Sequence, residues 1–305
     1  MKYQSLLVIA IPATLFIASP ADYAQTTTLS SHTWVSAEGN DTSGTGTRAA
    51  PFATFQKAVD ETASGGEVSV VDPGNYGAVI IVEPVTIDGG GVRGSITFSG
   101  TNNQGVYVST GVSGPVVLRN LDIDGGDSGG YPIYLYGTGT LVVEDCSVHG
   151  FTGSGIFVNM LGGSDNVSVT NTNVTGGSYG FYEFSGSGGT LHGSMRNCVL
   201  SQASEAGINV GGEGTLDISN SSIIQNYNGV ECADSTVSAV GCMLSDNTGG
   251  AALAYGEGKI RLSNDSLFDN ATGIGLEGGT VMTLHNNVSS GNTTPGEANA
   301  NAATF

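Results

Sequence analysis

Basic residues are scarce in this sequence. The 305-residue chain carries eight Lys and Arg against 27 Asp and Glu, which gives a formal net charge of −19. Nucleic acids and anionic membrane surfaces are bound through clusters of Lys and Arg. No such cluster occurs here, so we exclude nucleic acid and anionic membrane surfaces as partners. The same charge would repel an anionic polysaccharide unless a metal ion bridged the carboxylates.

Long apolar segments are missing after the first two dozen residues. The one continuous run covers residues 6–18, after a basic N-terminus, and residues 19–24 that follow it are mostly small. This order is typical of a secretory signal peptide, and the run is short for a bilayer span. We predict a signal at residues 1–24, cleaved after Ala21 or Ala24. Export would place the protein in the periplasm, in the medium or on the cell surface, without membrane insertion.

The sequence contains a repeat that runs from about residue 105 to about residue 292, with a period of roughly 21 to 27 residues. Each unit opens with glycine and an alternating apolar pair, as in Gly105-Val-Tyr-Val and Gly155-Ile-Phe-Val. A second phrase follows, apolar-x-apolar-x-Asn/Asp-x-x-apolar, as in residues 116–123. A unit this short cannot bury its own apolar face, so neighbouring units must stack and share one core.

The apolar phrases alternate by twos, and no stretch inside the repeat has a helical period. Three short strands fit each unit, and stacking them predicts an all-β fold with three parallel sheets. The sequence therefore predicts a right-handed parallel β-helix of about ten coils. The 49 glycines of the chain agree with its many tight turns.

An Asn or Asp occupies the sharp bend between the second and third strands of most units. Such a side chain tolerates a left-handed backbone and hydrogen-bonds to its counterpart one coil away. Glycine adopts the same backbone, so Gly241 interrupts the row without harm. The predicted ladder consists of Asn120, Asp145, Asn171, Asn197, Asn220, Asn264 and Asn286.

Four cysteines occur, and their positions argue against disulfide bonds. Cys146, Cys198 and Cys242 follow the bend in units that are two steps apart. With about 4.8 Å between stacked units, their sulfur atoms would lie roughly 10 Å apart, too far to bridge. Cys232 belongs to another strand set. We expect four free thiols that pack as small apolar side chains.

A helix is expected only before the first coil. Within residues 50–62, Phe55, Ala58, Val59 and Thr62 share one helical face. This helix would cap the N-terminal end of the solenoid. We divide the chain, after the signal, into three parts: an N-terminal strand and capping helix at 25–66, the β-helix at 67–292, and a polar tail at 293–305.

Three phrases near the N-terminus resemble a known group of proteins. They are residues 34–41 (Trp-Val-Ser-Ala-Glu-Gly-Asn-Asp), 51–59 (Pro-Phe-Ala-Thr-Phe-Gln-Lys-Ala-Val) and 72–77 (Asp-Pro-Gly-Asn-Tyr-Gly). They are similar to the opening of exported bacterial β-helix repeat proteins of the pectate-lyase-like superfamily. The resemblance implies an extracellular or periplasmic setting and contact with polysaccharides.

The resemblance brings no catalytic motif with it. Lyases of this superfamily use Ca²⁺ held by carboxylates and an Arg or Lys base on the first-strand face. Here Arg119 and Arg196 fall just before the bend instead. The motif sets of the galacturonan hydrolases and uronan epimerases are also missing.

One candidate metal site is an acidic turn. Asp122, Asp124 and Asp127 lie close together in sequence, and His149 occupies the position equivalent to Asp124 one coil on. Adjacent carboxylates are ligands that Ca²⁺ prefers. The alternative is a solvated acidic turn without a metal. No other cofactor is implied.

Two glutamates are candidate catalytic residues. Glu183 and Glu231 lie on first strands two coils apart, roughly 10 Å by strand spacing. That separation approaches the carboxyl pair of an inverting glycosidase. Counting from the preceding glycines, however, directs them to opposite faces unless a bulge intervenes.

The strongest surface feature is aromatic. Outward positions of the first strands carry aromatic side chains on successive coils, and these should form a stripe suited to the C–H faces of sugar rings. The alternatives are a ladder that only stabilises the sheet and an interface that forms an oligomer. The predicted aromatic face consists of Tyr107, Tyr134, Tyr136, Phe157, Asn159, Tyr182 and Phe184.

The leading hypothesis is an exported protein that binds a neutral or metal-bridged polysaccharide along this face, without a recognisable catalytic set. A Ca²⁺-dependent polysaccharide lyase, or another carbohydrate-active enzyme, is the first alternative. A structural cell-surface or adhesin-like protein is the second.

Overall fold

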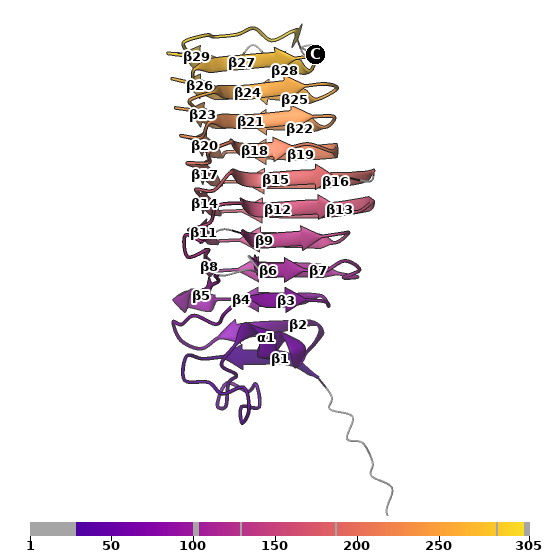
Figure 1. Cartoon of the computed structure of the whole chain (residues 1–305), viewed down its shortest axis with the longest axis vertical. Helices are drawn as coiled ribbons and strands as arrows, with labels where there is room; N and C mark the ends of the chain where they lie inside the picture. The colour runs from indigo at the N-terminus through magenta and orange to yellow at the C-terminus, as the bar shows by residue number, and fades with distance from the viewer. Residues whose placement is uncertain (1–28, 100–103, 129, 187, 285, 302–305) are drawn as a thin grey trace, which may run out of the picture.

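The computed structural model describes residues 29–99, 104–128, 130–186, 188–284 and 286–301. Within these residues the chain forms three parallel sheets, one short α-helix and one 3-10 turn. Figure 1 shows the coils stacked in a straight rod from the N-terminal to the C-terminal end. The predicted signal peptide lies outside the described residues. No helix in the described ranges is long and apolar enough to cross a membrane.

Sheet I contains the strands that open each coil, from the Gly-apolar phrases. Its order follows the chain, with nine strands among the described residues. They are β3 (Val79–Ile81), β6 (Gln104–Val108), β9 (Tyr131–Tyr136), β12 (Ser154–Met160), β15 (Tyr179–Ser185), β18 (Ala206–Val210), β21 (Asn228–Ala233), β24 (Gly250–Tyr255) and β27 (Thr272–Glu277).

Sheet II contains the strands that precede the bend, with twelve strands in the described part of the chain. They are β1 (Ser30–Val35), β2 (Thr62–Val70), β4 (Val85–Asp88), β7 (Pro115–Arg119), β10 (Thr140–Glu144), β13 (Gly163–Thr170), β16 (Gly189–Arg196), β19 (Glu213–Ser219), β22 (Thr236–Val240), β25 (Lys259–Ser263), β28 (Thr280–Thr283) and β30 (Ala300–Asn301).

Sheet III contains the short strands that follow the bend, again nine among the described residues. They are β5 (Gly94–Thr97), β8 (Leu121–Asp124), β11 (Ser147–His149), β14 (Asn173–Thr175), β17 (Val199–Ser201), β20 (Ser222–Ile224), β23 (Met243–Ser245), β26 (Ser266–Phe268) and β29 (Val288–Ser290). Nine described coils thus contribute a strand to every sheet. The predicted three-sheet parallel β-helix is confirmed.

The core fills the inside of the coils. Alternate residues of most strands point inward, and the resulting column of Val, Ile and Leu is almost fully buried. All four cysteines are free and buried in this column. Burial raises the pKa of the Cys146 thiol to about 12, so this side chain is an inert apolar filler.

The bend between sheets II and III has the expected left-handed backbone. The φ angle is 54° at Asn120, 52° at Asn171 and 66° at Gly241. The Nδ2 group of Asn197 donates to Oδ1 of Asn171 at 3.2 Å, and Asn171 donates to Asp145 at 3.1 Å. Near the C-terminal end the backbone N–H of Asn264 donates to Oδ1 of Asn286.

A second row of asparagines lies inside the coils. This row was not predicted from the sequence. Its members are Asn226, Asn247, Asn270 and Asn292, at steps of 21, 23 and 22 residues. Each of the first three amides donates to Oδ1 of the next, and those three side chains are at most 2% exposed. Buried amides are tolerated because each also donates to a backbone carbonyl, such as Leu200 O.

The helix α1 (Phe55–Asp60) lies at the N-terminal end and buries Phe55, Ala58 and Val59. Thr54 caps it, because its side chain accepts a hydrogen bond from the Lys57 N–H. The helix is shorter than the predicted span of residues 50–62. Phe52 forms a bridge with Val35 of β1, and residue 62 already begins β2. Both ends of the predicted span are therefore in β pairing, and the helix is confined to the residues between them.

Candidate functional site

Outward side chains of sheet I form one continuous row along the coil axis. The Cα pairing of neighbouring strands aligns them without a shift in register, so the row runs straight from β6 to β21. Its members are Tyr107, Tyr134, Phe157, Tyr182, Asn209 and Glu231.

The central rings of this row stack on one another. The centroids of Tyr134 and Phe157 lie 4.9 Å apart with planes 14° apart, and those of Phe157 and Tyr182 lie 5.2 Å apart with planes 5° apart. These separations are close to the spacing of the strands that carry the rings. Their faces are therefore turned toward each other.

Two further tyrosines belong to this cluster and were absent from the prediction. Tyr131 lies 4.9 Å from Phe157, and Tyr179 stacks on Tyr182 at 4.6 Å. Each lies three residues before a tyrosine of the row on its own strand, in Tyr131-Pro-Ile-Tyr and Tyr179-Gly-Phe-Tyr. That shared spacing was the available signal. Enclosed by these rings, Phe157 is only 8% exposed, so it supports the ladder and presents little surface to a ligand.

The exposed part of the aromatic face lies along its margin. Tyr136, Asn159 and Phe184 are paired in the next outward row, and Phe184 is 46% exposed. Asn159 Nδ2 donates to the hydroxyl of Tyr134 at 2.8 Å. Tyr107 meets Tyr134 edge to face, with planes 73° apart, and it stacks with Tyr136, with centroids 6.1 Å apart and planes 28° apart. Ring faces and polar groups thus alternate along this margin.

At β21 the row carries a carboxyl group that is held by amides. Asn209 Nδ2 donates to Oε2 of Glu231 at 2.5 Å, and Asn228 Nδ2 donates to Oε1 at 2.6 Å. Burial raises the pKa of Glu231, and the hydrogen bonds from the two asparagines oppose that rise. The arrangement fixes a polar, hydrogen-bonding end to an otherwise aromatic surface.

The structure does not bring Glu183 and Glu231 together as a catalytic pair. Glu183 is fully buried inside the coil, where it is paired with Val158 and Val210, whereas Glu231 points outward. Sheet alternation separates them, as simple counting had indicated. Glu183 Oε2 accepts from the Gly212 N–H at 2.7 Å, and Oε1 has no partner.

Burial raises the pKa of Glu183 to about 7 and that of Asp165 to about 6. Asp165 is also fully buried and has one oxygen without a partner. Both are interior groups of the solenoid, and neither contributes to the aromatic face.

In the acidic turn, His149 lies close to Asp122 and Asp124. His149 Nε2 lies 3.2 Å from Oδ1 of Asp122, and its Nδ1 lies 3.6 Å from Oδ1 of Asp124. Asp127 lies in the following turn, where its N–H donates to Gly150 O. Across the described residues no group of three or more His, Cys, Asp or Glu is placed to hold a metal ion. The calcium site stays a prediction.

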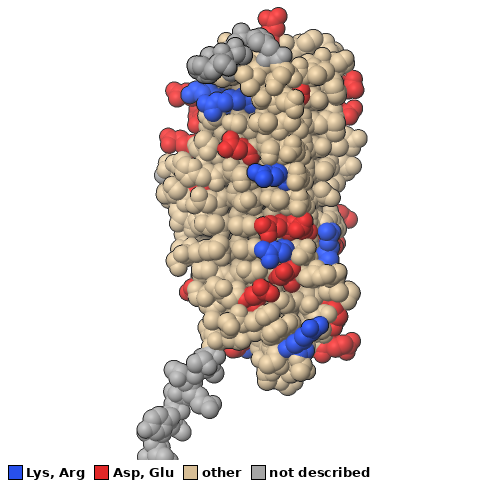
Figure 2. All heavy atoms as spheres, turned by 180° about the vertical axis from the view of Figure 1, so that it is seen from behind, with Lys and Arg blue, Asp and Glu red and all other residues tan. Residues whose placement is uncertain are grey.

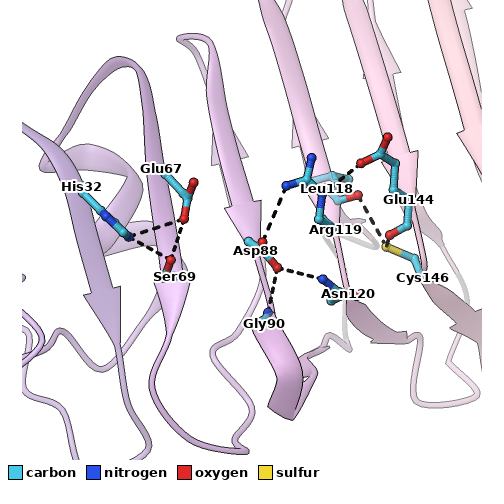
Figure 3. Close-up of polar contacts among 10 residues, drawn as sticks. All are labelled: His32, Glu67, Ser69, Asp88, Gly90, Leu118, Arg119, Asn120, Glu144 and Cys146. Carbon is cyan, nitrogen blue, oxygen red and sulfur yellow. Dashed lines mark hydrogen bonds and ion pairs between the residues drawn. The ribbon is translucent and has the colours of Figure 1, made fainter.

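Arg119 is likewise engaged in the surface of sheet II. Figure 3 shows it between Asp88 and Glu144, which come from the neighbouring strands β4 and β10. Its Nε lies 2.9 Å from Glu144 Oε2, and its Nη1 lies 3.7 Å from Asp88 Oδ2. Asp88 also accepts from Asn120 Nδ2 at the start of the bend ladder. This arginine ties adjacent coils together and is remote from the row on sheet I.

Comparison with known proteins identifies the fold. A family model described as "Right handed beta helix region" matches residues 63–194 and 189–303. No curated protein matches the chain.

Two solved structures are similar in fold. Pectate lyase Pel9A has a TM-score of 0.64 and 15% sequence identity, over 92% of this chain and 80% of that one. A rhamnogalacturonan lyase has a TM-score of 0.52 and 15% identity, over 77% of this chain and 73% of that one.

Proposed function

Because this chain belongs to the right-handed β-helix family, we propose that it binds a neutral polysaccharide along the aromatic face of sheet I. The observation that carries the proposal is the straight row from Tyr107 to Glu231, which spans six consecutive coils in register. A linear polymer lying parallel to the coil axis would pass the outward side chains of successive coils at steps of about 4.8 Å.

The face combines the two kinds of contact that sugar rings accept. Exposed ring surface at Tyr107, Tyr136 and Phe184 suits the apolar C–H faces of a sugar. Asn159 and Glu231 add amide and carboxyl groups that hydrogen-bond to hydroxyls. The stacked rings beneath keep this surface rigid, which lowers the entropy lost on binding.

The charge of the chain favours a neutral ligand. With a formal charge of −19, the protein repels a polyanion over the roughly 8–10 Å range that salt leaves unscreened. The two solved structures of similar fold are named as lyases of pectate and rhamnogalacturonan. Those names support a carbohydrate ligand, while the residues of this face support binding more than catalysis.

Affinity electrophoresis tests the proposal. The purified chain would be run in gels that contain neutral polysaccharides, such as galactan, glucomannan or xyloglucan, and in matched gels without polymer. Retardation by at least one neutral polymer is expected. Unchanged mobility in every gel would remove the proposal.

A polysaccharide lyase is the second candidate, favoured by the fold shared with two lyases. It would require a base and a metal site on sheet I. The aromatic face carries neither, since its charged member is Glu231. Ultraviolet absorbance of unsaturated products, with pectate as substrate and with or without a chelator, distinguishes the two functions.

A further inference from the structure

Sheet II carries a hollow on its outward side, on a different sheet from the aromatic face. The hollow encloses about 430 Å³ over β13, β16 and β19. Its polar lining comes from Ser168, Thr170, Ser194, Arg196, Asp217 and Ser219. A second hollow of about 220 Å³ shares Ser168 and Ser194 with it and continues over β10. The combined depression crosses four adjacent strands, about 14 Å along the coil axis.

This depression lies over the C-terminal halves of β13, β16 and β19. Strands β13 and β16 are eight residues long, whereas β10 and β22 have five. Figure 1 shows these two coils projecting beyond their neighbours. Four of the side chains that line the first hollow carry hydroxyl groups, and they lie beside Arg196 and Asp217.

Among the described residues, most of the polar side chains that line the hollow form no hydrogen bond or ion pair with the protein. In the part of the chain that the structure describes, neither Arg196 nor Asp217 forms an ion pair within 4.0 Å. Both lie on the exposed side of their strands. The hydroxyls of Ser194 and Ser168 contact each other at 3.3 Å. By contrast, Arg119 on the same sheet is engaged with two carboxylates.

The combination of groups suits a polyhydroxylated ligand. A guanidinium only donates hydrogen bonds, a carboxylate only accepts them, and a hydroxyl does both. A sugar diol also donates and accepts, and hydrogen bonds to charged partners are the stronger ones. Arg196 and Asp217 bring opposite charges, so the hollow has no net charge to attract a polyanion. Figure 2 shows basic and acidic side chains interspersed on a surface that is otherwise uncharged.

We propose that this hollow on sheet II is a second glycan-binding site, specific for a neutral, polyhydroxylated chain segment. Arg196 donates to sugar hydroxyls, Asp217 accepts from them, and the four serine and threonine hydroxyls complete the contacts. The site needs no metal ion. It is independent of the aromatic face in its residues and lies on a different sheet.

If sheet I also binds a polysaccharide, as proposed above, the protein has two binding surfaces on one rod. Each surface would hold a separate polysaccharide chain, since the two sheets face different directions. The protein would then cross-link polymer chains, and binding at both surfaces would raise the overall affinity.

The test is affinity electrophoresis of four forms of the full chain in gels containing neutral galactan, glucomannan or xyloglucan. One variant carries Arg196→Gln and Asp217→Asn, which removes both charges and leaves polar side chains at both positions. A matched control carries Arg48→Gln and Asp60→Asn, two exposed residues of the N-terminal region. Ser194→Leu, which fills the hollow, is the third variant. Circular dichroism confirms that each variant is folded.

We expect both hollow variants to bind the retarding polymer at least about tenfold more weakly than the control, because hydrogen bonds to charged groups are lost or blocked. Affinity equal to that of the control in both would overturn the proposal. So would stronger retardation by polygalacturonate with chelator than by any neutral polymer, because the ligand would then be anionic.

The two proposals fail separately. Loss of binding in a Tyr136→Ala/Phe184→Ala variant, with normal binding in both hollow variants, would remove the second site and leave the aromatic face. The reverse pattern would remove the aromatic face and leave the hollow.

Discussion

Phe157 and Tyr182 stack almost in parallel, with ring centroids 5.2 Å apart and planes 5° apart. Phe157 is enclosed on its other side by Tyr134, so it is the centre of a three-ring stack across three coils. The aromatic face therefore contains two kinds of ring, enclosed rings that stabilise the sheet and marginal rings that are accessible.

The first prediction concerns the stability of this stack. Phe157→Ala should lower the free energy of unfolding by about 3 kcal/mol, because it removes a buried aromatic side chain and leaves a cavity. Phe184→Ala, at a 46% exposed ring of the same face, should cost less than about 1 kcal/mol. Urea unfolding followed by circular dichroism measures both. Equal small losses would mean that the stack does not stabilise the sheet.

A second prediction concerns the buried carboxyl groups and pH. Burial raises the pKa of Glu183 from 4.5 to about 7. Between these values the folded chain retains a proton that the unfolded chain has lost, so stability falls as pH rises through this window. The loss attributable to Glu183 should reach about 3 kcal/mol above pH 7 and be absent below pH 4.5.

Glu183→Gln separates this effect from general charge repulsion. The variant should be more stable than the wild type at pH 8 and should have a flatter pH profile between pH 5 and 7. Thermal unfolding across pH 4 to 8 provides the measurement. A wild-type stability that rises over this range, or a variant with an unchanged profile, contradicts the pKa assignment.

A third prediction compares the two asparagine rows. Asn247→Ala should cost about 2–3 kcal/mol, because it leaves the Asn226 N–H and its amide without their buried acceptor. Asn197→Ala, in the exposed row at the bend, should cost about 1 kcal/mol, since water replaces its lost partner. Chemical denaturation of both variants tests the difference. A larger loss at Asn197 would show that the outer row dominates.

The sequence repeat specified the fold and the outward row because glycine and asparagine mark the bends, and alternation then sorts every residue inside or outside. The same counting directed Glu183 and Glu231 to opposite faces, with a bulge as the alternative. It could not show that the rings of Tyr134, Phe157 and Tyr182 stack face to face, since ring orientation depends on packing with side chains from other coils.

Other features were missed for a related reason. The inner asparagines of β20–β21 and later turns follow the repeat, but their direction into the core depends on turn geometry. Tyr131 and Tyr179 precede the glycine or proline from which the strands were counted. The hollow on sheet II is lined by side chains from neighbouring coils, and only the assembled sheet brings them together.

A fourth prediction concerns catalysis. Incubation of the full chain with pectate and Ca²⁺ should give no increase in ultraviolet absorbance from unsaturated products, because the row on sheet I offers no Arg or Lys base. A metal-dependent increase that a chelator abolishes would instead establish the lyase alternative. Glu231→Gln would then show whether the carboxyl at the end of the row takes part.

The central claim is that the exposed margin of the aromatic face binds a neutral polysaccharide. Affinity electrophoresis of Tyr136→Ala/Phe184→Ala tests it most directly, with Phe268→Ala as control, since Phe268 is a half-buried aromatic residue of sheet III. The account predicts about a tenfold or greater loss of affinity in the double variant and wild-type affinity in the control. Equal retardation of the double variant and the control by the same polymer would contradict it.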